Sequence, residues 1–211
     1  MFLKICGITR LGDALHAIEN GATALGFVLW PRSPRYVTPE TVSEILAALP
    51  ASVMTVGVFV NEQAEEVSRV MSQTKLTAVQ LHGDEPLSYA ASLHWPVLRS
   101  ITLQTAHSVC LTWPASTTLL LDAADPQRRG GTGERVDWSA AAQLARTRRV
   151  VLAGGLTPDS VAAAISQVRP YGVDVSSGVE EEPGVKNARK VARFLALARK
   201  AAAEVSQVME K

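Results

Sequence analysis

Residues 2–9 read FLKICGIT, a short apolar run that ends at Cys6-Gly7 without a G-x-G-x-x-G turn. An open, doubly wound α/β sheet often carries that glycine-rich turn directly after its first strand. Further along the chain, apolar stretches rich in β-branched residues alternate with amphipathic stretches rich in Ala, Glu and Arg. This alternation is typical of α/β proteins. The first strand and its outgoing turn therefore favour a closed barrel over an open sheet.

The alternation predicts about eight strands with helices between them. The expected strands are Phe2–Cys6, Ala24–Leu29, Val53–Val60, Thr77–Leu81, Val97–Ile101, Thr118–Leu121, Val150–Ala153 and Val173–Val175. The expected helices are Leu11–Asn20, Pro39–Leu49, Glu62–Gln73, Glu85–Leu93, Ser139–Arg146, Pro158–Val168 and Ala188–Val205. The segment after Ile101 is poorly periodic, so the sequence leaves open whether a helix forms there. About eight βα units in just over 200 residues, with no linker between them, indicate one α/β domain over residues 1–211, a (β/α)8 TIM barrel.

The composition favours a small-molecule ligand. Hydrophobic residues make up 47% of the chain, charged residues 19%, and the formal net charge is +1, which is typical of neither a disordered chain nor a nucleic-acid-binding surface. The apolar runs fall short of the roughly 20 residues that span a bilayer, and no signal-peptide pattern is present. Cys6 and Cys110 form no disulfide or metal-binding pattern. We expect a cytoplasmic protein with no metal, nucleic-acid partner or membrane partner.

The residues suited to chemistry follow the predicted strands. In a (β/α)8 barrel the active site lies on the loops that leave the C-terminal ends of the strands. The unusual residues of this chain fall on those loops: Cys6-Gly7, Pro31-Arg32-Ser33-Pro34-Arg35, Asn61, His82-Gly83, Asp122, Gly154-Gly155 and Ser176-Ser177-Gly178. We therefore expect one site at that end of the barrel.

Cys6 and Asp122 are the candidate catalytic pair. Strand alternation puts Lys4 and Cys6 on one face, pointing into the barrel, although a free cysteine is usually only a small buried hydrophobe. Asp122 ends a strand and precedes the glycine-rich loop Gly130–Gly133, which indicates an acid beside a mobile lid. A turn-forming aspartate is the alternative. Because their strands lie roughly opposite in a ring of eight, the two side chains could act as base and acid on one substrate.

Two glycine-containing loops predict a phosphate site. Barrels commonly bind phosphate through backbone N–H groups on the loops that follow strands seven and eight. In this chain these loops contain Gly154, Gly155, Ser177 and Gly178. We expect Asp174, on the preceding strand, to bind substrate as well.

Arg35 and His82 are the remaining candidates for substrate binding. Arg35 lies in a proline-rich segment, and its planar guanidinium suits a carboxylate. Arg32 is expected to be solvated. His82 is expected to position substrate, with a histidine that is hydrogen-bonded in a turn as the alternative.

The motifs together resemble the phosphoribosylanthranilate isomerase family of tryptophan biosynthesis, in order over almost the whole chain. They are KICGIT (4–9), WPRSPRYV (30–37), VGVFVN (56–61), QLHGDE (80–85), LLLDA (119–123) with GGTG (130–133), VLAGGL (151–156) and GVDVSSGVE (172–180) followed by PG-x-K (183–186). The resemblance implies a (β/α)8 barrel that converts N-(5-phosphoribosyl)anthranilate into the 1-deoxyribulose phosphate by an Amadori rearrangement, without cofactor. It also implies that Cys6 is the general base, Asp122 the general acid, and Arg35 the residue that holds the anthranilate carboxylate.

That chemistry requires a protonated Asp122 and a partly ionised Cys6, so we expect the site to push both pKa values toward neutrality, with help from Lys4 for the thiolate. Other phosphosugar isomerases and a non-catalytic phosphosugar-binding barrel are the alternatives. An aldolase with a lysine Schiff base is disfavoured, because strands five to seven contain no lysine. The sequence leaves open whether the chain is a monomer or a homodimer.

Overall fold

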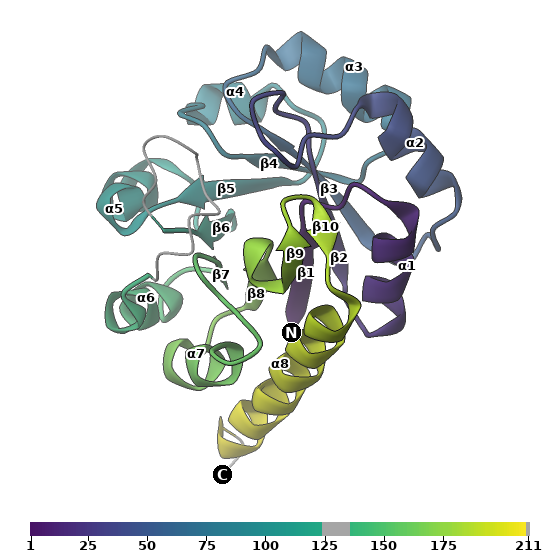
Figure 1. The fold of residues 1–211 in the computed structure, drawn as a ribbon. Coiled ribbons are helices and arrows are strands. Elements are labelled where there is room, and N and C mark those ends of the chain that lie inside the picture. The colour runs from purple at the N-terminus through teal and green to yellow at the C-terminus, as the bar shows by residue number, and fades with distance from the viewer. Residues whose placement is uncertain (124–135, 210–211) are drawn as a thin grey trace.

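Eight parallel strands close into a barrel in the computed structural model, which describes residues 1–123 and 136–209 (Figure 1). The strands are β1 (Phe2–Cys6), β2 (Ala24–Val28), β3 (Met54–Phe59), β4 (Ala78–Leu81), β5 (Val97–Ile101), β6 (Thr118–Leu121), β7 (Val150–Leu152) and β8 (Gly172–Val175). Each strand pairs with the next one along the chain, and β8 closes the ring by pairing with β1, where Lys4 lies opposite Asp174. The predicted TIM barrel is confirmed, and every strand lies within one residue of its expected bounds.

Helices surround the barrel in sequence order (Figure 1). They are α1 (Leu11–Glu19), α2 (Pro39–Ala47), α3 (Ala64–Thr74), α4 (Leu87–Ala91), α5 (Leu103–Thr112), α6 (Trp138–Ala145), α7 (Val161–Val168) and α8 (Ala188–Met209). The segment after Ile101, which the sequence left open, is the helix α5. Thr102 and Thr105 cap its start in a reciprocal capping box, but Val109 is its buried residue while Leu111 is 75% exposed. Leu103, Ala106, Val109 and Cys110 share the face that packs on the core, but exposed Leu111 and the small size of Ala106 and Cys110 weaken the apolar periodicity of the sequence.

The predicted start of α4 at Glu85 is wrong, because the helix begins at Leu87 and Glu85 lies in the preceding loop. The Glu85 carboxylate accepts hydrogen bonds from the backbone N–H groups of Asn61 and Gly83, at 2.7 and 2.9 Å. Arg99 donates to the same carboxylate at 2.8 Å. Glu85 therefore ties together the loops that follow β3 and β4 instead of opening a helix.

The two faces of β1 have separate environments. Leu3 and Ile5 belong to the large hydrophobic core between the barrel and its helices. Lys4 and Cys6 face inward and are buried, as the alternation predicts. Deeper in the barrel, two small apolar clusters pack against Phe2; one comprises Val56, Ala78 and Leu98, and the other Leu120, Val151 and Ala153. The barrel is thus apolar at its base and polar towards the C-terminal ends of its strands.

The chain between β8 and α8 forms a small structure that the sequence did not predict. A 3₁₀-helix, η1 (Ser177–Val179), leads into β9 (Glu180–Glu182), which pairs antiparallel with β10 (Val185–Lys186). Gly184 turns between the two strands at φ 84°, a conformation that glycine adopts without strain. This hairpin brings Glu180 and Lys186 to the end of the barrel where β1 and β8 finish.

The last helix, α8, packs against α7 and α1. Its buried residues follow helical spacing, and they are Val191, Phe194, Leu195, Ala198 and Ala201. The helix is therefore amphipathic, with one face on the barrel's outer layer. Among the described residues, no helix combines the length and the apolar character needed to cross a membrane.

Candidate active site

The end of β1 brings Cys6 next to a buried ion pair. Lys4 is fully buried, and its Nζ donates a hydrogen bond to Oδ1 of Asp174 at 3.1 Å. Lys4 also faces the Cys6 thiol. Asp174, which was expected to bind substrate, is therefore engaged inside the barrel by Lys4 and lies just before the loop that follows β8.

The charges around Cys6 oppose one another. Burial raises the pKa of the Cys6 thiol; the ammonium groups of Lys4 and Lys186 counteract it, while the Asp174 carboxylate adds to it. The overall direction is upward, contrary to the expectation that the site would lower this pKa toward neutrality. Burial lowers the pKa of Lys4, but the negative charges of Asp174 and Cys6 outweigh burial and raise it. Lys4 therefore stays protonated and places a positive charge beside the Cys6 thiol.

Gly26 of β2 leaves the space in which the Cys6 thiol and the Lys4 ammonium lie. It pairs with Cys6 across the two strands. A β-carbon at Gly26 would lie 2.7 Å from Cys6 Sγ and 3.0 Å from Lys4 Nζ. Sequence reasoning missed this residue, because a glycine within an apolar strand does not reveal which neighbouring side chain needs its space.

Arg35 reaches the same end of the barrel, where its guanidinium is already held by Glu180. Nε of Arg35 lies 2.9 and 3.1 Å from the two carboxylate oxygens, and Nη2 lies 2.7 Å from Oε2. Lys186 donates to Oε1 of the same carboxylate at 2.6 Å. Burial raises the pKa of Glu180, but Arg35 and Lys186 outweigh burial and lower it. Glu180 is therefore a carboxylate that fixes the orientation of Arg35.

Asp122 and His82 face each other on the other side of the barrel. Oδ1 of Asp122 accepts a hydrogen bond from the backbone N–H of Ala123 at 2.8 Å. Oδ2 lies 3.7 Å from Nε2 of His82. The other ring nitrogen of His82, Nδ1, lies 2.8 Å from Oγ of Ser100 and 2.9 Å from Nε2 of Gln80. Asp122 thus lies between the backbone N–H of Ala123 and the His82 ring, and the His82 ring is in turn held by Gln80 and Ser100.

The loops after β7 and β8 approach each other closely. Gly154 and Gly155 have φ values of 73° and 66°, in the left-handed region that favours glycine. A β-carbon at Gly178 would collide with the backbone oxygen of Leu156. Only glycine at position 178 therefore allows the two loops to pack at this distance, and their backbone N–H groups lie at the same end of the barrel as Cys6.

The predicted site residues thus form three groups at one end of the barrel: Cys6 with Asp174 and Arg35, His82 with Asp122, and the loops of Gly154, Gly155, Ser177 and Gly178. The loop Gly130–Gly133 lies outside the described residues. Sequence reasoning gave no role to Gly26, Gln80, Ser100, Glu180 or Lys186. Gln80 and Ser100 carried a usable signal, since each is a polar residue on the inward face of an otherwise apolar strand. Among the described residues, no three His, Cys, Asp or Glu side chains gather in a way that could hold a metal ion.

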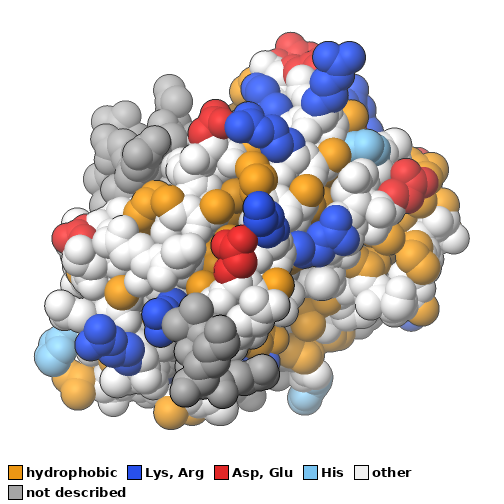
Figure 2. Space-filling view, turned by 90° about the horizontal axis from the view of Figure 1, so that it is seen from below, with side chains coloured by type: hydrophobic (Ala, Val, Ile, Leu, Met, Phe, Trp, Pro, Cys, Tyr) orange, Lys and Arg blue, Asp and Glu red, His pale blue; other side chains and the backbone are white. Residues whose placement is uncertain are grey.

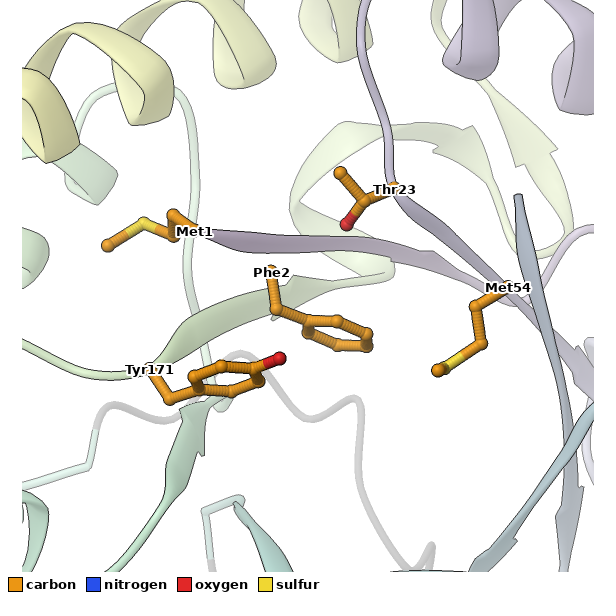
Figure 3. Close-up of a pocket in the computed structure, with 5 residues that line it drawn as sticks. All are labelled: Met1, Phe2, Thr23, Met54 and Tyr171. Carbon is orange, nitrogen blue, oxygen red and sulfur yellow. The ribbon is translucent and has the colours of Figure 1, made fainter. Parts of the chain in front are cut away.

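A pocket at the opposite end of the barrel is separate from these residues (Figure 3). Met1, Phe2, Thr23, Met54 and Tyr171 line it, and each lies at or just before the start of a strand. The rings of Phe2 and Tyr171 stack there with centroids 5.9 Å apart. Because barrel enzymes place their chemistry at the C-terminal ends of the strands, this pocket is not the candidate active site.

One face of the molecule is shown in Figure 2. Lys and Arg side chains lie scattered on it among acidic and hydrophobic side chains, and those of the described residues form no continuous basic band in this view. This distribution agrees with the nearly balanced charge of the sequence.

Comparisons with known proteins place this chain among isomerases. A model of the family PRAI, N-(5'phosphoribosyl)anthranilate (PRA) isomerase, matches residues 3–196. The N-(5'-phosphoribosyl)anthranilate isomerase of Citrifermentans bemidjiense is 47% identical over 201 residues, covering 95% of this chain and 98% of that protein.

Two solved structures are similar over nearly their whole length. A phosphoribosylanthranilate isomerase in complex with reduced 1-(o-carboxyphenylamino)-1-deoxyribulose 5-phosphate has a TM-score of 0.85 and 39% identity, covering 95% of this chain and 99% of that chain. A monomeric form of the dimeric enzyme from Thermotoga maritima has a TM-score of 0.84 and 38% identity at the same coverage.

Proposed function

The chain belongs to the N-(5'-phosphoribosyl)anthranilate isomerase family, and we propose that Cys6 and Asp122 are the general base and general acid of its reaction. It is a phosphoribosylanthranilate isomerase of tryptophan biosynthesis. The observation that carries the proposed roles is the placement of a buried thiol beside the Lys4 ammonium at the end of β1, with Asp122 held at the end of β6.

In the proposed mechanism, Asp122 protonates the ring oxygen of the ribose, so that the C1′–O bond breaks and the nitrogen lone pair forms an iminium. The Cys6 thiolate then removes the proton from C2′, and the C2′–H electron pair neutralises the iminium to give an enolamine. The enolamine tautomerises to the ketone. Hydrogen moves within the substrate and no external oxidant or reductant is consumed, so this chemistry needs no cofactor.

The thiolate has electrostatic support at the moment it is needed. Lys4 and Lys186 both lower the pKa of Cys6 against the effect of burial. The cationic iminium forms at the carbon next to C2′, and its charge favours the thiolate over the thiol. The positive charges of the site and of the intermediate thus act together on the group that must accept the proton.

Arg35 is proposed to hold the anthranilate carboxylate. Glu180 binds Arg35 through Nε and Nη2, which presets the plane of the guanidinium. The Nη1 side of that plane is the proposed contact for the substrate carboxylate, because a guanidinium can serve two carboxylates at separate edges. The backbone N–H groups near Gly154, Gly155, Ser177 and Gly178 are proposed to bind the phosphate, and the close approach of the two loops supports this.

The direct test of the reaction uses the purified chain and N-(5'-phosphoribosyl)anthranilate. We expect conversion to 1-(o-carboxyphenylamino)-1-deoxyribulose 5-phosphate, separated by chromatography, with neither metal nor nucleotide added. Binding of the substrate without conversion would support the non-catalytic alternative instead.

Arg35→Ala is expected to raise KM more than it lowers kcat. The carboxylate lies far from the reacting carbons, so Arg35 binds it similarly in the ground state and the transition state. Loss of a charged hydrogen bond costs about 1.5–3 kcal/mol, which corresponds to roughly 10–100-fold in KM. The matched control is Arg32→Ala, which removes an exposed arginine from the same segment and should leave KM unchanged. A loss confined to kcat would contradict the proposed role.

Gly26→Ala is expected to lower kcat by up to about 10²-fold, because displacing a catalytic group by about 1 Å can cost that much. The new methyl group would push against Cys6 Sγ and Lys4 Nζ. Overpacking should also reduce the free energy of unfolding by about 1–3 kcal/mol. Gly57→Ala is the control, because its β-carbon would crowd Phe59 and Leu76 in the outer core instead. Thermal melts and steady-state kinetics on both variants separate the two effects, and a wild-type kcat in Gly26→Ala would show that the Cys6 position tolerates the change.

A further inference from the structure

Two buried polar side chains, Gln80 and Ser100, lie inside the barrel beneath the pair of His82 and Asp122. Gln80 precedes His82 by two residues on the inward face of β4 and is 1% exposed. Its Nε2 lies 2.9 Å from Nδ1 of His82 and 3.1 Å from Oγ of Ser100. Oγ of Ser100, on the neighbouring strand β5, lies 2.8 Å from the same Nδ1. His82 is therefore held by two buried side chains on the ring edge that faces away from Asp122.

The amide orientation of Gln80 follows from what each arrangement leaves unsatisfied. With Nε2 toward His82, both amide hydrogens have acceptors, and Oε1 is the buried atom that lacks a partner in the described part of the chain. The reversed amide would place its NH2 group in that position and leave two donors unmatched. Orphaned buried N–H groups are rarer than under-satisfied carbonyls. The orientation with Nε2 toward His82 is thus the less costly one.

This orientation decides the tautomer of His82. An amide NH2 can only donate, so Nδ1 must accept and carries no proton. The hydroxyl of Ser100 can accept from Gln80 and donate to the same Nδ1. The ring proton of neutral His82 then lies on Nε2, and Nε2 faces Oδ2 of Asp122 at 3.7 Å. Catalytic hydrogen bonds are often this long before substrate binds.

We propose that Gln80 and Ser100 are positioning residues that keep the ring proton of His82 on Nε2, where it stabilises the carboxylate that Asp122 forms on giving up its proton. The inference rests on the proposed role of Asp122 as the general acid. The N–H of Ala123 already serves Oδ1, so both oxygens of the nascent carboxylate face donors. These interactions strengthen as charge develops, which lowers the barrier of the protonation step.

Other ionisable groups near this pair are engaged elsewhere within the described residues. On the loop after β4, the Glu85 carboxylate is bound by Arg99, which points to the outside of β5. Asp84 on the same loop contacts Asn61. On the β1 and β8 side of the barrel, Lys4 is paired with Asp174 and Lys186 with Glu180. Among the described residues of β4 to β6 and the loops that follow them, His82 and Asp122 face each other.

The test replaces the donor at position 80. Gln80→Glu is nearly isosteric, but its carboxylate attracts a proton to Nδ1 and leaves Nε2 as an acceptor. We expect kcat to fall about 10–100-fold, by analogy with the loss seen when the outer partners of metal-bound histidines are removed, with little change in KM. Gln80→Met removes the donor without adding charge, so it should lower kcat less than Gln80→Glu does. It serves as the test if the glutamate variant folds poorly. Thr55→Val is the control, because it removes a buried hydroxyl at the far end of β3 and should leave kcat unchanged.

Nitrogen NMR of the labelled histidines gives the readout that a merely structural role would not move. We expect the Nε2–H tautomer for His82 in the wild type, assigned with His82→Gln, and the Nδ1–H tautomer in Gln80→Glu. The limb of the pH profile of kcat that Asp122→Asn abolishes should move to higher pH in Gln80→Met, because a less stabilised carboxylate keeps its proton longer. An Nδ1–H tautomer in the wild type, or altered tautomers with unchanged kcat and pH profile, would overturn the proposal. Full activity in Asp122→Asn would instead refute the role of Asp122, and the tautomer measurement would still stand.

Discussion

Cys6→Ala is expected to lower kcat by about 10²–10⁴-fold, the contribution of one positioned proton-transfer group. Alanine cannot take the proton from C2′, while the Asp122 side of the barrel and the phosphate loops stay unchanged. KM should change much less than kcat, because the thiol does not hold the substrate in the proposed mechanism. Circular dichroism and a thermal melt would verify that the barrel is intact, since the change removes only one sulfur atom.

The chain supplies its own control for the loss of a thiol. Cys110→Ala removes the other free cysteine, which lies on α5 in the outer layer, and kcat should stay at the wild-type value. Cys6→Ser keeps the size of the side chain but offers a hydroxyl, a far weaker base near neutral pH. Its residual activity should fall with pH as Asp122 loses its proton, and it should show no rise. A folded Cys6→Ala enzyme with normal kcat would falsify the mechanism and make Cys6 a space-filling residue.

The barrel could be predicted from the sequence because its signals are local. Each strand is a short apolar run between punctuated helix starts, such as Thr38 before Pro39, where Thr38 caps α2 as the spacing indicates. α5 and the hairpin of β9 and β10 could not be predicted in this way. The core-facing stripe of α5 is weakened in the sequence by exposed Leu111, and β9 carries three consecutive glutamates, which hydrophobic patterning does not indicate as a strand.

The candidate site was predictable residue by residue but not in its connections. The sequence placed Cys6, Arg35 and Asp122 at one end of the barrel, because each lies at or beyond the C-terminal end of a strand. It gave no indication that Glu180 holds Arg35, since 145 positions separate them and only the hairpin after β8 brings them together. It also predicted the wrong direction for the pKa of Cys6, because the extent of burial depends on side chains from several strands.

Asp122→Asn is expected to lower kcat by about 10²–10⁴-fold, because the amide has the shape of the acid but no proton to give to the ribose ring oxygen. The amide oxygen can still accept the hydrogen bond from Ala123 N–H, while the amide NH2 group takes the place of the oxygen that faces His82. Asp159→Asn is the matched control, since it neutralises an exposed carboxylate paired with Arg193, and its kcat should be unchanged.

The pH dependence of Asp122→Asn distinguishes its role from that of Cys6. The wild type needs protonated Asp122 together with ionised Cys6, so its kcat should follow a bell-shaped profile. The asparagine variant retains only the requirement for the thiolate, so its residual activity should rise with pH and never fall. Burial raises the pKa of Cys6, so the midpoint of this rise should lie above that of an exposed thiol, about 8.5. A residual rate that still falls at high pH would mean that another group donates the proton to the substrate.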